Sequence, residues 1–86
     1  MILHNRIALF RAESGLTRRA LAEAVEVNPQ TIGYLERGDY KPSLELAMRI
    51  ARTFGVPVEL LFSFEPFEPV AAALQRAATP PEEREA

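Results

Sequence analysis

Cysteine is absent from this chain of 86 residues, and histidine occurs only once, at His4. Without cysteine the chain can form no disulfide bond, no thiolate nucleophile and none of the common cysteine-based zinc sites. A single histidine also argues against a histidine-based metal site or a catalytic triad. We therefore expect neither a metal ion nor a cofactor.

Long apolar runs are also missing, and none approaches the roughly 20 residues that a membrane-spanning helix needs. Arg11 and Glu13 interrupt the apolar stretch that a signal peptide would require near the N-terminus. No glycine-rich phosphate loop is present, and no two carboxylates have a spacing that indicates acid–base catalysis. These absences predict a soluble, cytoplasmic protein that is not an enzyme and has no membrane partner.

What the chain does contain is enough apolar material, 48% of its residues, for one small folded domain. The net charge of −2 is not typical of a nucleic-acid-binding protein, but the charge is unevenly distributed. Residues 1–62 contain eight arginine and lysine residues against seven acidic ones, whereas residues 63–86 contain two against five. The first part is therefore mildly basic, and the acidity belongs to the C-terminal part.

Helical spacing and capping residues predict five short helices with short connections. Glycine follows three of them, at Gly15, Gly38 and Gly55, where a helix commonly ends. No stretch alternates for long enough to form a central strand, so the expected fold class is an all-α, compact five-helix bundle. The expected helices span residues 5–14, capped by Asn5; 18–25, capped by Thr17; 28–37, with Pro29 at the first helical position; 44–54, capped by Ser43; and 56–62.

The second and third predicted helices are joined by so few residues that they must cross steeply. A small residue is needed where they approach, and Ala22 is suitably placed. The remaining inner positions are apolar, and we expect them to form the core: Leu21, Val25, Val27, Ile32, Leu35, Leu44, Ala47, Ile50, Ala51 and Phe54.

The third predicted helix also carries a polar row that faces away from this core. Such a row is either simply solvated or used to bind a partner, and the helix alone does not distinguish these alternatives. Its members are Pro29, Gln30, Thr31, Gly33, Tyr34 and Arg37.

The stretch GLTRRALAEAVEVNPQTIGYLERGDYKPSLELAMRIARTFGVPVELLF shows an agreement of caps, loops and apolar positions in one register. In this respect residues 5–62 resemble the helix-turn-helix domain of phage repressor/Cro-type (XRE-like) bacterial regulators. The resemblance implies a lambda-repressor-like bundle that binds duplex DNA, with the helix at 28–37 in the major groove. It also implies a transcriptional regulator, expected to be a repressor, that binds an inverted repeat as a homodimer.

The resemblance also implies which residues contact DNA. By position, the base-reading residues would be Gln30, Thr31, Tyr34 and Arg18, and the backbone contacts Arg19, Asn28, Gly33, Arg37, Tyr40 and Lys41. Glu36 is expected to be a structural partner of a nearby arginine or of a backbone group rather than a catalytic acid.

Three positions depart from the pattern of the family. Glu26 occupies a turn position that usually holds glycine, so a positive φ there would cost about 1 kcal/mol. Pro29 removes one hydrogen-bonding side chain from the start of the recognition helix, and Gly33 lowers helix propensity. These departures bear on the base sequence that is read, not on the fold.

Residues 63–78 form an aromatic C-terminal extension, and residues 79–86, rich in proline and charge, are expected to be disordered. Two alternatives remain for the extension: its phenylalanines fold back onto the domain, or the segment forms a two-fold dimer contact that includes a short strand pair. The residues expected in such a dimer interface are Phe62, Phe64, Phe67, Val70 and Leu74. The rival functional hypothesis is an antitoxin or adaptor that binds a protein partner through this extension.

Overall fold

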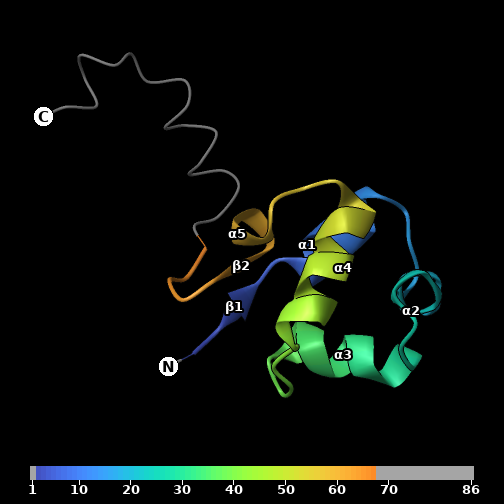
Figure 1. Cartoon of the computed structure of the whole chain (residues 1–86), viewed down its shortest axis with the longest axis horizontal. Helices are drawn as coiled ribbons and strands as arrows, with labels where there is room; N and C mark the ends of the chain where they lie inside the picture. The colour runs from blue at the N-terminus through green and yellow to red at the C-terminus, as the bar shows by residue number, and fades with distance from the viewer. Residues whose placement is uncertain (1, 68–86) are drawn as a thin grey trace, which may run out of the picture.

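The computed structural model describes residues 2–67 of the chain. Within them, five helices form a bundle, and a two-stranded ribbon joins the first and last elements (Figure 1). Val70, Leu74 and the segment expected to be disordered lie outside the described residues. The elements, in chain order, are β1 (His4–Asn5), α1 (Ile7–Glu13), α2 (Arg18–Val25), α3 (Pro29–Arg37), α4 (Leu44–Phe54), α5 (Val58–Leu61) and β2 (Phe62–Ser63).

Three of the helices begin where the sequence predicts, because a side chain caps each of them. The Thr17 hydroxyl accepts a hydrogen bond from the Ala20 amide at 3.0 Å, and the Ser43 hydroxyl accepts one from the Leu46 amide at 3.1 Å. The Asn28 carboxamide oxygen accepts from the Gln30 amide at 2.8 Å. These bonds satisfy amide groups that have no partner inside the helix and so fix the first turn of α2, α3 and α4.

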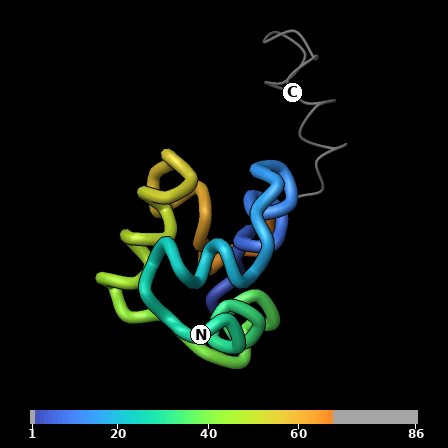
Figure 2. Tube along the Cα trace, turned by 90° about the vertical axis from the view of Figure 1, so that its right-hand side faces the viewer, coloured from blue at the N-terminus to red at the C-terminus, as the bar shows by residue number. Residues whose placement is uncertain are grey.

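The α2–α3 connection is a sharp turn, and the two helices cross steeply (Figures 1 and 2). Ala22, the small residue predicted at the crossing, is 1% exposed. Glu26, directly after α2, has φ = 61°, so this non-glycine residue adopts the costly left-handed conformation. The turn holds α3 against the bundle while leaving one side of it open to solvent.

The buried core forms between the helices and includes most of the residues predicted for it. One prediction is wrong: Leu44 is 73% exposed, whereas Leu46 is buried. Leu44 begins α4, and Met48 follows it one helical turn later on the same outer side, so both project away from the bundle. The core consists of Ile7, Leu21, Ala22, Val25, Ile32, Leu35, Leu46, Ala47, Ile50, Ala51, Leu61 and Phe62.

The ribbon closes the domain by bringing together segments almost sixty residues apart. β1 and β2 are antiparallel, with His4 opposite Ser63 and Asn5 opposite Phe62. The Arg6 amide also donates a hydrogen bond to the Leu61 carbonyl oxygen at 2.9 Å. The short strand pair expected within a dimer contact therefore forms inside a single chain.

Three phenylalanines, one directly before the extension and two within it, have different environments. Phe62 is 9% exposed and belongs to the core, so its expected place in a dimer interface is wrong. Strand pairing next to α5 turns its side chain inward. Phe67 is half-buried beneath the Arg6 guanidinium, which lies 4.1 Å from the ring centroid. Phe64, by contrast, is 60% exposed.

Candidate nucleic-acid interface

The outer side of α3 presents polar side chains while its inner side is packed into the core. Gln30 and Arg37 are exposed, and Tyr34 between them is 46% exposed. Ile32 and Leu35, on the opposite side of the same helix, are buried. The helix is thus held by its apolar residues with its polar side chains directed outward. Thr31, at the border of the two sides, is half-buried.

A shallow groove runs along this outer side and brings together residues from α2 and α3. Arg18 reaches it from the first position of α2, although it lies twelve residues before Gln30 in the sequence. Basic, amide and aromatic groups therefore converge at one place on the surface. The residues that line the groove are Arg18, Pro29, Gln30, Gly33, Tyr34 and Arg37.

Gly33 lines this groove. It was expected to face outward, and this expectation is wrong. It is buried, and a Cβ atom built on it would lie 3.4 Å from Arg37 Nη1. The Arg37 guanidinium thus covers the glycine. It also lies 5.1 Å from the centroid of the Tyr34 ring and donates from Nε to Asp39 Oδ2 at 3.1 Å. A direct contact of DNA with the Gly33 backbone would require Arg37 to move.

The loop after α3 supplies the next group of candidate residues. Tyr40 is 50% exposed and shares a second hollow with Thr31, Tyr34 and Asp39. Lys41 follows it and is also exposed. Because Tyr34 borders both hollows, Asp39 and Tyr40 continue the outer side of α3.

Arg19 is adjacent to Arg18 in sequence but has a different environment. Its side chain is 83% exposed, and its ion pair with Glu23 has an Nε–Oε1 distance of 3.8 Å. It is not among the residues lining the groove. The structure therefore separates two arginines that the sequence places side by side.

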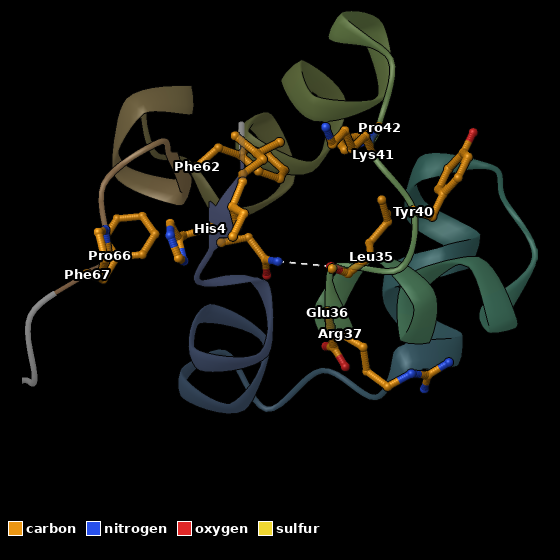
Figure 3. Close-up of a pocket in the computed structure, with 14 residues that line it drawn as sticks. His4, Leu35, Glu36, Arg37, Tyr40, Lys41, Pro42, Phe62, Pro66 and Phe67 are labelled. Carbon is orange, nitrogen blue, oxygen red and sulfur yellow. Dashed lines mark hydrogen bonds between the residues drawn. The ribbon is translucent and has the colours of Figure 1, made fainter.

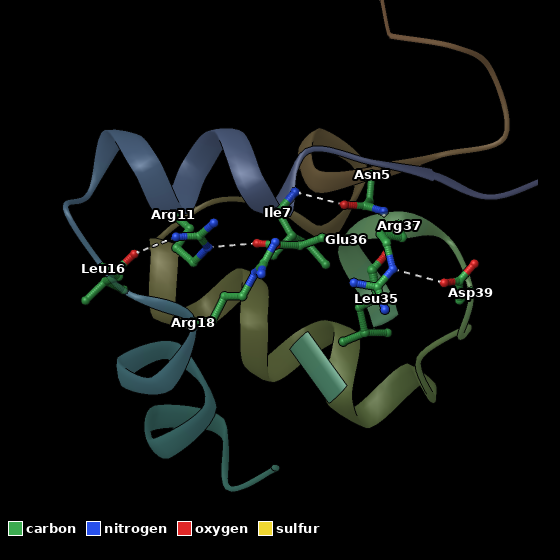
Figure 4. A network of polar contacts seen from close by, with 9 residues as sticks. All are labelled: Asn5, Ile7, Arg11, Leu16, Arg18, Leu35, Glu36, Arg37 and Asp39. Carbon is green, nitrogen blue, oxygen red and sulfur yellow. Dashed lines mark hydrogen bonds and ion pairs between the residues drawn. The ribbon is translucent and has the colours of Figure 1, made fainter. Parts of the chain in front are cut away.

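Glu36 connects three helices, and its prediction as a structural partner of arginine is confirmed (Figure 4). One carboxylate oxygen accepts from Arg11 Nε at 2.7 Å, and the other accepts from Arg18 Nε at 2.8 Å. Arg11 also donates from Nη1 to the Leu16 carbonyl oxygen at 3.1 Å. Arg11 could not be identified as this partner from sequence, because the two residues are 25 positions apart and no local spacing relates them.

The environment of Glu36 shifts its ionisation. Burial alone would raise the pKa of this carboxyl, whose side chain is 4% exposed. The hydrogen bonds from Arg11 and Arg18, together with their positive charges, outweigh burial, so the pKa is lowered from its usual value of 4.5. Glu36 is therefore ionised at neutral pH and binds both arginines as a carboxylate.

A larger hollow, of about 630 Å³, lies between the ribbon and the loop after α3 (Figure 3). His4, Phe62 and Phe67 line it from the ribbon side, and Lys41 and Pro42 line it from the loop side. Its wall is partly aromatic, and Arg37 lines both this hollow and the groove on α3.

Residues 2–67 bring together no group of three or more histidine, aspartate or glutamate side chains that could hold a metal ion. None of the helices within this range has the length and apolar character needed to span a membrane.

Comparisons with known proteins agree with this architecture. Residues 7–61 match the family model described as helix-turn-helix. The chain is 48% identical over 63 residues to an uncharacterized HTH-type transcriptional regulator of Archaeoglobus fulgidus, which covers 73% of this chain and 90% of that protein. It is 38% identical over 63 residues to the uncharacterized HTH-type transcriptional regulator YgzD of Bacillus subtilis, which covers 73% of this chain and 96% of that protein.

Solved structures show the same similarity. A protein from Bacteroides fragilis superposes with a TM-score of 0.66 at 30% identity, over 71% of this chain and 98% of that one. The clp gene regulator ClgR from Corynebacterium glutamicum superposes with a TM-score of 0.58 at 40% identity, over 60% of this chain and 55% of ClgR. With its two crossed helices and outward-facing α3, the chain belongs to the helix-turn-helix family of DNA-binding transcriptional regulators.

Proposed function

We propose that this protein regulates transcription, as a repressor, by inserting the outer side of α3 into the major groove of a specific duplex sequence. The observation that carries the proposal is the division of α3 into a buried apolar side and an exposed polar side. The major groove of B-DNA, about 12 Å wide, admits one α-helix, and its base edges offer hydrogen-bonding groups that distinguish all four base pairs. Occupation of a promoter would then exclude RNA polymerase.

The base-reading roles follow from side-chain chemistry and position. Gln30 is exposed in the first turn of α3, and its amide can accept from and donate to one adenine at the same time. Thr31 can contact a thymine methyl group or form a hydrogen bond. Tyr34 lies one turn further along and reaches either a base edge or the sugar-phosphate backbone.

Residues around this row would bind the phosphates. Asn28 uses its carboxamide oxygen as a helix cap, which leaves its NH₂ group to donate to a phosphate. Arg37 is paired with Asp39 at the surface, and exposed pairs of this kind are worth only about 0–1 kcal/mol, so a phosphate can replace the carboxylate at little cost. Arg19, Tyr40 and Lys41 are exposed and complete the proposed set, with Gly33 beneath Arg37.

We further propose that two copies bind an inverted repeat, since one domain covers only a single half-site. The half-sites would lie about 34 Å apart, one turn of the double helix. Phe64, the exposed phenylalanine of the described extension, and Phe67, together with Val70 and Leu74 beyond the described residues, are the proposed contacts. We assign the protein to the cytoplasm, where a prokaryotic regulator meets its DNA.

Solution mass tests the dimer. Because Phe62 belongs to the core, the chain should be shortened after Phe67 and not before it. We expect the full chain to be dimeric at micromolar concentration and the shortened chain to be more weakly associated. If both are monomers with and without DNA, the dimer proposal is wrong.

Selection of bound duplexes from a random pool tests the function itself. We expect the purified full chain to enrich an inverted repeat with a constant half-site spacing. Replacing Lys41 with alanine should weaken binding to all duplexes alike and reduce the salt dependence by the equivalent of about one phosphate contact. Failure to enrich any sequence at low salt, by protein shown to be folded, would contradict the proposal.

A further inference from the structure

The carboxylate of Glu36 divides its two oxygens between arginines that differ in surroundings. Arg11, from α1, has a side chain that is 21% exposed and a second bond to the Leu16 carbonyl oxygen. It is therefore part of the frame of the domain. Arg18, from the start of α2, has a side chain that is 52% exposed and lines the groove beside Gln30.

The bond to Glu36 constrains Arg18 in a particular way. Its Nε–H is directed at Glu36 Oε1 at 2.8 Å, while its two Nη groups form no hydrogen bond to any residue between positions 2 and 67. The guanidinium is planar, so fixing Nε also fixes the plane and direction of the two Nη groups. Glu36 is itself fixed by Arg11 and by burial, with 4% of its side chain exposed.

A guanidinium held in this way suits a target that offers two acceptors at fixed positions. Guanine does so in the major groove, where O6 and N7 accept a bidentate pair of hydrogen bonds from arginine. Prior immobilisation reduces the conformational entropy that the side chain loses on binding. A phosphate makes weaker demands on orientation, and the more exposed Arg19 side chain is suited to it.

We propose that Glu36 is a positioning residue for Arg18, and that Arg18, so held, reads a guanine next to the base pair read by Gln30. The inference rests on the proposed function, because it requires α3 to occupy the major groove. It goes further by assigning a role to a residue that contacts no DNA and by specifying one base of the half-site. Phosphate binding by Arg18 is the competing outcome.

The experiment uses the full chain, the duplex selected from the random pool, and every single base-pair variant of one half-site. Binding is measured for wild type, Arg18→Gln, Glu36→Gln and the matched control Arg19→Gln. We expect Arg18→Gln to lose a preference for guanine of about ten- to one-hundred-fold at one position. Glu36→Gln should lose part of that preference at the same position only, and Arg19→Gln should weaken all duplexes equally.

Three results would overturn the inference. If Arg18→Gln weakens all duplexes alike, Arg18 binds a phosphate. If Glu36→Gln folds and retains the full guanine preference, Glu36 does not position Arg18. If wild type selects no sequence, the proposed function fails and the inference with it, which distinguishes that case from the first two.

Loss of folding in Glu36→Gln would be detected by circular dichroism, and Arg18→Lys then serves as the test. Lysine keeps the positive charge but lacks the planar pair of Nη groups and the Nε–H that Glu36 holds. The inference requires Arg18→Lys to lose the guanine preference while keeping most of its affinity for other duplexes. Retention of the preference by Arg18→Lys would contradict it.

Discussion

The α2–α3 pair and the β1–β2 ribbon each join two segments of the chain, but over very different separations in sequence. α2 and α3 pack against each other, and a turn of three residues connects them. β1 and β2 lie at opposite ends of the described residues, with His4 opposite Ser63. The candidate DNA-binding side is therefore built from local contacts, whereas the ribbon can form only when the helices between its strands are in place.

The largest expected effect concerns the ribbon. Replacing Phe62 with alanine should lower the free energy of unfolding by about 3 kcal/mol, because it empties a core position that holds β2 against the bundle. Urea denaturation measures this loss. Phe64→Ala, at a position that is 60% exposed, is the matched control and should change stability by less than about 0.5 kcal/mol. Equal effects of the two substitutions would contradict the assignment of Phe62 to the core.

The next effect concerns the α2–α3 crossing. Ala22→Leu should destabilise the domain by about 1–3 kcal/mol, because a larger side chain at a position only 1% exposed forces the helices apart. The control is Ala24→Leu, in the same helix but exposed. Thermal unfolding of the two variants checks the prediction. If Ala22→Leu is as stable as Ala24→Leu, the helices are less closely packed at this position than the structure indicates.

The third prediction concerns pH and the ion pairs that tie α1 and α2 to α3. The folded-state pKa of Glu36 is lowered, so its ionised form contributes stability above the usual value of 4.5, and this contribution is lost as pH falls through the folded pKa. Glu36→Gln has no such titration. The stability difference between wild type and Glu36→Gln should therefore narrow as pH falls below 4.5. A difference that stays constant down to acid unfolding would argue against the network.

The smallest expected effect concerns the turn itself. Glu26 has φ = 61°, so Glu26→Gly should relieve strain and stabilise the domain by up to about 1 kcal/mol. The ion pair of Glu26 with Arg49, at 3.4 Å and exposed, offsets little of this gain. Glu23→Gly, inside α2, should have the opposite sign and cost about 1 kcal/mol. Denaturation midpoints should therefore move in opposite directions.

The elements that the sequence predicted well are those that depend on local signals. Thr17, Asn28 and Ser43 cap helices that begin directly after them, and the boundaries of α2 and α4 agree with the prediction. The positive φ of Glu26 agrees with the pattern of the family, which usually has glycine at this turn position. Local hydrogen bonding and backbone conformation are properties of neighbouring residues and can be recognised in one sequence.

The features that could not be predicted from the sequence mostly depend on residues far apart in the chain. The ribbon pairs two strands of two residues each, which are too short to show an alternating pattern. For the same reason Phe62 could not be assigned to the core rather than to an interface. Leu44 was wrongly predicted to be buried, because an apolar residue at the first position of a helix can lie beyond the end of the bundle.

In the candidate site, too, local features could be predicted from the sequence and long-range contacts could not. The exposed row of α3 could be predicted from helical periodicity, and five of the ten residues predicted to contact DNA line the groove: Arg18, Gln30, Gly33, Tyr34 and Arg37. The Glu36 network could not, since its partners come from α1 and α2. The burial of Gly33 beneath Arg37 also depends on a side-chain conformation that no sequence pattern specifies.

The central claim is that the outer side of α3 contacts DNA, and mapping of backbone amide shifts by nuclear magnetic resonance tests it most directly. The selected duplex would be added to the ¹⁵N-labelled full chain. The account predicts that the largest shift changes fall at residues 17–19 and 28–37, and that Gln30→Ala reduces them for the preferred duplex. Unchanged amides along α3, with the largest changes elsewhere in the domain, would contradict it.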